Sequence, residues 1–84
     1  MYLKKKYTIF PNPTDKELFI KGDLADDLQV NIYDMLGKIV VNKIKPANNK
    51  IDCSALADGS YIVSLTQQDK IIQQDKITIS SQIN

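Results

Sequence analysis

The sequence predicts a small all-β domain, an antiparallel β-sandwich of about seven short strands. Apolar and polar residues alternate with a period of two in one segment after another, most clearly in residues 28–33. Turn signals rich in glycine, proline, asparagine and aspartate recur about every 8 to 12 residues. No segment keeps a helical period of 3.6 residues, so the pattern excludes a helical fold.

Four strands are expected in the first half of the chain. Each is a run of β-branched, aromatic or alternating residues that ends near proline, glycine or aspartate. The second half adds a short strand, a longer one with Tyr61, Val63 and Leu65 facing inward, and two short isoleucine-containing strands after a turn at residues 67–70. The expected strands are residues 7–10, 17–21, 28–33, 38–44, 49–52, 60–66, 71–72 and 76–79.

Two turns in the first half have a defined geometry. Pro11 and Pro13 flank Asn12 and fix φ at both prolines, which predicts a bend between strands without a helix. Residues 34–38 separate two alternating runs and place Gly37 where a hairpin needs positive φ. This segment is therefore expected to be a hairpin tip.

In the second half, residues 54–57 are expected to form one helical turn, with Asp52 or Ser54 capping its free N–H groups. The turn at Gly59, also expected at positive φ, then delivers Tyr61 to the start of a strand, as in the tyrosine corner of immunoglobulin-like sandwiches. The residues expected to face the core are Leu18, Ile20, Val30, Ile32, Ile51, Leu56, Tyr61, Val63, Ile77 and Ile79.

Three blocks carry a family resemblance through their order and spacing: FPNPT at residues 10–14, VNIYDMLGK at residues 30–38 and IDCSALADGSYIV at residues 51–63. From about Tyr7 to Ile79 the chain resembles the type A C-terminal sorting domain of the type IX (Por) secretion system of Bacteroidetes-type bacteria. The resemblance implies an immunoglobulin-like β-sandwich, in agreement with the strand pattern.

The resemblance also implies a function: a sorting signal that directs an attached cargo protein through the type IX translocon. The implied partners are the translocon, a sortase-like peptidase that removes the domain, and the upstream cargo. The implied destination is the cell surface or the medium, reached through the periplasm. The alternative is an immunoglobulin-like binding or spacer module of a secreted protein, which contacts carbohydrate or protein through an aromatic face around Phe19 and Tyr33.

The resemblance further indicates which residues serve as the signal. We expect the last strand, residues 76–79, to be the part that the translocon reads. The chain departs from the family pattern because residues 80–84 follow that strand and contain no lysine. The expected signal or recognition residues are Pro11, Asn12, Pro13, Gly37, Lys38, Asp58, Gly59, Tyr61, Lys76, Ile77, Thr78 and Ile79.

Length and charge limit the other classes of function. The 84 residues allow one domain, and a net charge of +1 gives no electrostatic drive toward nucleic acid or anionic membranes. No apolar run approaches the roughly 18 residues of a spanning helix, and residues 1–6 lack the apolar region of a secretory signal. We expect a leader at residues 1–6, the sorting domain at residues 7–80, a tail at residues 81–84, and a longer protein of which this is the C-terminal part.

Catalytic chemistry is not expected. The chain has no histidine, no Gly-rich phosphate loop and one cysteine, Cys53, which is expected to be a small buried hydrophobe. The acidic cluster of Asp23, Asp26 and Asp27 lacks the spacing of a calcium loop and is expected to be solvated, so neither a metal nor a cofactor is predicted.

Two binding modes remain open in the sequence. Tyr7, Tyr33, Tyr61 and Phe19 are candidates for an aromatic stripe on one sheet, although Tyr61 fits the core better. An edge strand of the sandwich is a candidate for pairing with another chain, including a second copy of the domain.

Overall fold

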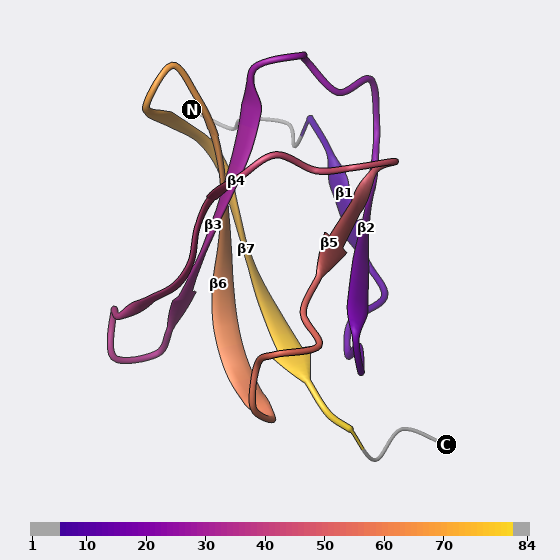
Figure 1. Ribbon diagram of the computed structural model, residues 1–84, viewed down its shortest axis with the longest axis vertical. Helices are drawn as coiled ribbons and strands as arrows, with labels where there is room; N and C mark the ends of the chain where they lie inside the picture. Colours follow the sequence, from indigo (N-terminus) through magenta and orange to yellow (C-terminus); the bar gives the residue numbers. More distant parts are fainter. Residues whose placement is uncertain (1–5, 82–84) are drawn as a thin grey trace, which may run out of the picture.

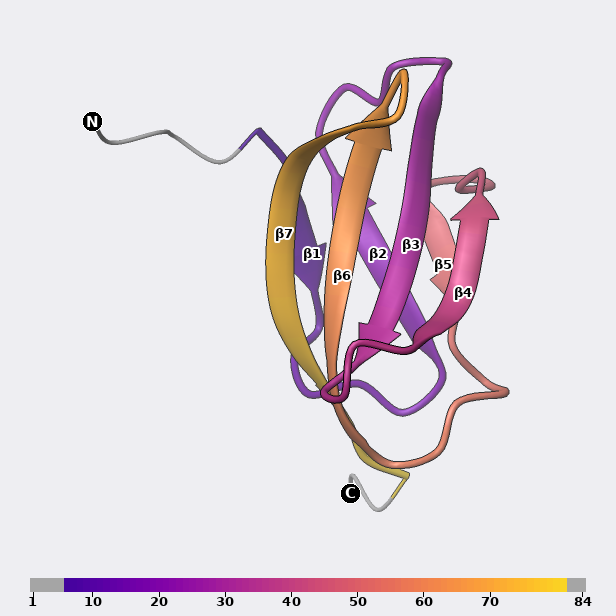
Figure 2. The ribbon, with the colours of Figure 1, turned by 90° about the vertical axis from the view of Figure 1, so that its left-hand side faces the viewer.

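Two antiparallel β-sheets pack face to face in the computed structural model, which describes residues 6–81 (Figures 1 and 2). One sheet has three strands in the order β1-β2-β5, and the other has four in the order β4-β3-β6-β7. This order is that of an immunoglobulin-like sandwich, as the sequence predicts. The strands are β1 (Thr8–Phe10), β2 (Glu17–Lys21), β3 (Leu28–Asp34), β4 (Ile39–Ile44), β5 (Lys50–Asp52), β6 (Gly59–Gln67) and β7 (Lys70–Ile79).

The core lies between the two sheets and is filled mainly by inward-facing residues of β2, β3, β5, β6 and β7. Nine of the ten expected core residues are buried, and Leu56 is only partly buried because it packs against the core from a loop. The sequence prediction of which side chains face inward is therefore confirmed for β2, β3, β5, β6 and β7. The buried hydrophobic residues are Tyr7, Leu18, Ile20, Leu28, Val30, Ile32, Ile51, Cys53, Tyr61, Val63, Leu65, Ile77 and Ile79.

The two turn predictions that rest on glycine are confirmed. Gly37 has a φ of +86° at the tip of the β3–β4 hairpin, and Gly59 has a φ of +153° at the start of β6. The hairpin tip is closed by the Asp34 carboxylate, which accepts hydrogen bonds from the N–H groups of Leu36 and Lys38, both at 2.9 Å. The Gly37 turn thus joins two strands of one sheet, and the Gly59 turn leads into β6 of the four-stranded sheet after β5 of the other.

The helical turn expected at residues 54–57 is wrong. The segment is a single turn in which the Leu56 N–H donates to the Cys53 carbonyl at 3.0 Å, and no helix forms. The chain reverses again at Gly59, so too few residues are left for a second turn of helical bonds. The expected cap is present, since the Asp52 carboxylate accepts a hydrogen bond from the Ser54 N–H at 2.9 Å.

The prediction of two separate strands at residues 71–72 and 76–79 is also wrong. They are parts of one strand, β7, because the polar residues between them continue the pairing with β6. Gln73, Gln74 and Asp75 lie opposite Leu65, Ser64 and Val63. Polar side chains are compatible with a continuous strand when each finds solvent or a hydrogen-bond partner.

Candidate functional site

The residues predicted to carry the signal come from four separate segments, and the fold brings these segments together around the second half of β7. The β3–β4 hairpin tip, the turn before β6 and the end of β7 all lie at one end of the sandwich (Figures 1 and 2). Gly59 and Tyr61 lie in β6 directly opposite Ile79 and Ile77 of β7. Lys38 stays exposed at the hairpin tip.

The proline-flanked segment lies along the outer edge of β7, where a further strand would otherwise pair. The Asn12 side-chain NH₂ group donates to the Lys76 carbonyl at 3.2 Å, and the Thr78 N–H donates to the Asn12 side-chain oxygen at 2.9 Å. Both peptide bonds that precede a proline here, Phe10–Pro11 and Asn12–Pro13, are cis. The prediction of a bend without a helix is confirmed, and the bend places a carboxamide on the strand edge.

Thr14 extends this contact along the same edge. It forms an isolated parallel bridge with Ile79, in which its N–H donates to the Thr78 carbonyl at 3.0 Å and its carbonyl accepts from Ser80 N–H at 2.8 Å. The edge-facing backbone groups between Lys76 and Ser80 are therefore largely satisfied from within the chain.

Gln73 makes a second contact of this kind farther up β7, and sequence reasoning missed it. Its side-chain oxygen accepts the N–H of Tyr7 at 2.9 Å, and its side-chain nitrogen donates to the Tyr7 carbonyl at 2.7 Å. Gln73 is 8% exposed. The period of two that places Ile77 and Ile79 inward also places Gln73 inward, which is the signal that identifies it.

The turn before β6 is fixed by two side chains. The Tyr61 hydroxyl donates to the Ala57 carbonyl at 2.6 Å, which is the geometry of a tyrosine corner. The Asp58 carboxylate accepts hydrogen bonds from the N–H and the hydroxyl of Ser81, at 3.1 and 3.0 Å. The turn is thus tied both to β6 and to the residues that follow β7.

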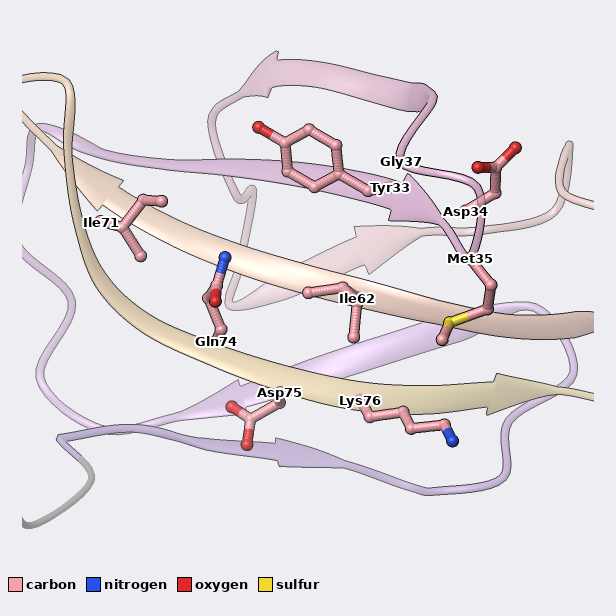
Figure 3. A pocket seen from close by; sticks show the side chains of 9 residues that line it. All are labelled: Tyr33, Asp34, Met35, Gly37, Ile62, Ile71, Gln74, Asp75 and Lys76. Carbon is pink, nitrogen blue, oxygen red and sulfur yellow. The ribbon is translucent and has the colours of Figure 1, made fainter.

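The outer face of the four-stranded sheet carries a shallow hollow of about 470 Å³ beside this edge (Figure 3). Tyr33, Ile62 and Ile71 project from three adjacent strands, and Met35 reaches toward Ile62 from the hairpin tip (Figure 3). The period of two along β3 and β6 places Tyr33 and Ile62 on this outer face, but it does not predict the strand pairing that brings them together. The lining residues are Tyr33, Asp34, Met35, Gly37, Ile62, Ile71, Gln74, Asp75 and Lys76.

Lys76 belongs both to the covered edge of β7 and to the lining of the hollow. Its carbonyl lies on the edge and accepts the bond from Asn12, while its side chain lines the hollow together with Gly37. Lys76 is thus bonded to the proline-flanked segment and lines the same hollow as the hairpin tip.

A family model described as "Secretion system C-terminal sorting domain" matches residues 8–80. The chain belongs to this family. It is a C-terminal sorting domain of the type IX secretion system, which is recognised by that system and serves a cargo protein upstream of it. Export by this route leads to the cell surface or the medium, and the family is not an enzymatic one. No curated protein matches the sorting domain significantly.

The aromatic stripe considered for the sorting domain does not form. Tyr7 and Tyr61 are buried in the core, at 2% and 7% exposure. Phe19 and Tyr33 lie on the outer faces of different sheets, β2 and β3, so they point away from each other. These four residues therefore provide no common aromatic face.

Phe19 also has two ring contacts within its own sheet, one aromatic and one cationic. Its centroid lies 5.6 Å from that of Phe10 in a stacked pair, and the Lys50 ammonium lies 5.7 Å from it.

Among residues 6–81 no group of three or more histidine, cysteine or acidic side chains is placed to hold a metal ion. The same residues contain no helix long and apolar enough to cross a bilayer. Of the basic triplet near the start of the chain, Lys6 is exposed, and Lys4 and Lys5 lie outside the described residues.

Cys53 is a buried side chain, as predicted. Burial raises the pKa of its thiol to about 11, and the nearby Asp52 carboxylate adds to the rise. At neutral pH the thiol is therefore protonated and enclosed, which is the opposite of an activated nucleophile.

Proposed function

We propose that the type IX machinery recognises the folded sorting domain through the second half of β7, Lys76–Ile79, and the two features that border it. These are the Pro11–Pro13 segment on the edge and the hairpin tip at Gly37 and Lys38. The observation that carries this proposal is the position of Lys76, which contacts Asn12 through its carbonyl and borders the hollow through its side chain.

The proposed signal residues divide into two roles. Ile77, Ile79 and Tyr61 are buried and hold the sheet together, while Asp58 and Gly59 shape the turn that leads into β6. Pro11, Asn12, Pro13, Lys38, Lys76 and Thr78 are exposed, so a partner is able to touch them directly.

The remaining steps follow the family and are proposals for this chain. The cargo passes through the periplasm to the translocon, a sortase-like peptidase cuts upstream of Tyr7, and the cargo stays at the surface or is released. In this proposal residues 7–80 are the functional domain, residues 1–6 a leader and residues 81–84 a tail. The domain itself has no catalytic role.

The test is a periplasm-directed reporter that carries residues 1–84 at its C-terminus, expressed in a bacterium with the type IX machinery. We expect the intact domain to bring the reporter to the surface or the medium, and deletion of residues 76–84 to leave it in the periplasm. The decisive variant is Lys76→Ala with Thr78→Ala, which changes two exposed side chains and leaves the core intact. It should reduce export while the melting temperature stays close to that of the parent.

The matched control is Lys21→Ala with Thr8→Ala, a lysine and a threonine that are both exposed and lie opposite each other on the three-stranded sheet. This control should be exported like the parent. A reporter that stays in the periplasm with the intact domain would contradict a signal in these residues and favour a binding module. Normal export of the Lys76 and Thr78 double variant would move recognition to Gly37 and Lys38.

A further inference from the structure

The outer edge of β7 is a strand edge with a strong tendency to pair. Strand β7 contains four isoleucines and a threonine in ten residues, and such composition favours β-structure. An edge of this kind is normally protected, because unpaired N–H and C=O groups invite pairing with another chain.

The edge of β7 is protected by the Asn12 side chain, which takes the place of a neighbouring strand's backbone groups. A neighbouring strand would satisfy the Thr78 N–H and the Lys76 carbonyl with one backbone acceptor and one backbone donor. The Asn12 carboxamide supplies the same two groups from one side chain, at 2.9 and 3.2 Å. Asn12 is exposed, so this cover lies on the surface of the molecule.

The covered edge is self-complementary. The outward-facing backbone groups that this segment covers belong to Lys76, Thr78 and Ser80, and the first two residues lie symmetrically on either side of Ile77. An antiparallel pair of two β7 strands with its two-fold axis at Ile77 places Lys76 of each copy opposite Thr78 of the other. Like charges are then not directly opposite, and the groups now bonded to Asn12 find backbone partners.

We propose that the segment Pro11–Thr14 is a removable edge cover, held by Asn12, which keeps the domain monomeric, and that the partner it excludes is β7 of a second copy, paired antiparallel about Ile77. The proposal concerns self-association and does not depend on recognition by the translocon. It gives the proline-flanked asparagine a role that the bend alone does not explain.

The test compares Asn12→Ala with Asn42→Ala in purified protein. Asn42 is an exposed asparagine on β4, so its replacement removes a carboxamide without touching the β7 edge. We expect Asn12→Ala to form a concentration-dependent dimer in sedimentation-velocity experiments, while the parent and Asn42→Ala remain monomeric. At dilutions where Asn12→Ala is still monomeric, exchange of the Thr78 amide should be roughly tenfold faster than in the parent.

The double variant Asn12→Ala with Thr78→Pro identifies the pairing strand. Proline at position 78 removes the N–H that faces the edge and is tolerated on edge strands. This variant should be monomeric. A dimer that persists in it would show pairing elsewhere and overturn the proposed edge.

The variant Asn12→Asp provides a second route if Asn12→Ala does not fold. Its carboxylate has nearly the same shape and accepts the Thr78 N–H, but it cannot donate to the Lys76 carbonyl. We expect a dimer here too, weaker than that of Asn12→Ala. Folded, monomeric Asn12→Asp and Asn12→Ala at millimolar concentration, or an unchanged Thr78 amide in Asn12→Ala, would overturn the proposal.

Discussion

At the scale of single residues, two side-chain carboxamides make hydrogen bonds that a neighbouring strand's backbone would otherwise make. Asn12 and Gln73 each use one donor and one acceptor to bond a strand-like pair of backbone groups, Asn12 on β7 and Gln73 on the segment before β1. The sequence predicts the bend at Asn12 from its prolines. It does not predict the bonds, because they depend on how two segments more than sixty residues apart meet in space.

Cys53 gives a prediction at the same scale. The folded protein keeps the thiol neutral, with a pKa of about 11 against 9.0 for the free side chain. Because the unfolded chain releases this proton more readily, Cys53 stabilises the fold fully below about pH 9 and loses that contribution as the pH rises toward 11. We expect the stability of the parent to fall by about 2 kcal/mol more than that of Cys53→Ala over this range.

The measurement is denaturant unfolding of both proteins between pH 8 and 11. The two proteins share all their other ionisable groups, so the contributions of those groups cancel in the difference. Equal pH dependence in the parent and in Cys53→Ala would contradict the raised pKa.

At the scale of elements, periodicity predicts strands well and their junctions poorly. Large apolar residues recur at every second position along most of β3 and β6, so these strands are found within one residue of their expected bounds. The polar stretch Gln73–Asp75 conceals the continuity of β7, because a glutamine that bonds backbone inside the fold has the same letter as one in a turn. The prediction of a helical turn at residues 54–57 is wrong because the chain reverses at Gly59 to enter β6, which a local pattern does not reveal.

The tyrosine corner gives the prediction at this scale. Tyr61→Phe removes the hydroxyl that donates to the Ala57 carbonyl and leaves the ring in place. We expect a loss of about 1 kcal/mol in the free energy of unfolding, equivalent to about 4–8 °C in melting temperature for a domain of this size.

The control for this change is Tyr33→Phe. The Tyr33 side chain lies on the outer face and its hydroxyl makes no hydrogen bond to residues 6–81, so its removal should leave the melting temperature nearly unchanged. Equal effects of the two substitutions would show that the corner bond contributes nothing specific.

At the scale of the whole molecule, the pattern of inward and outward residues determines the fold class, and strand pairing assembles the candidate surface. The core residues can be read from one strand at a time. The bond between Lys76 and Asn12, and the hollow that Lys76 lines together with Gly37, cannot be predicted in this way, because they depend on the order of strands in the sheet and on the path of the chain around its edge.

Adjacent residues on β6 test the inward and outward pattern. Val63 is fully buried, whereas Ile62 lies on the outer face. Val63→Asp buries a charge without a partner and should unfold the domain, whose total stability is on the order of 4–12 kcal/mol. Ile62→Asp should remain folded. Circular dichroism and amide NMR spectra distinguish the outcomes, and a folded Val63→Asp would refute the assignment of faces.

The contacts between the first and the last segments of the fold also constrain when the signal exists. Tyr7 bonds Gln73 and Asn12 bonds Thr78, each across 66 residues, and Thr14 bonds Ser80. A ribosome makes β7 after the cargo and all the other strands, so this edge can close only after they have been synthesised. A chain that terminates early, anywhere in the cargo or in the first six strands, never acquires the finished surface. If export requires β7, truncated chains are not exported, and no other mechanism is needed to recognise them.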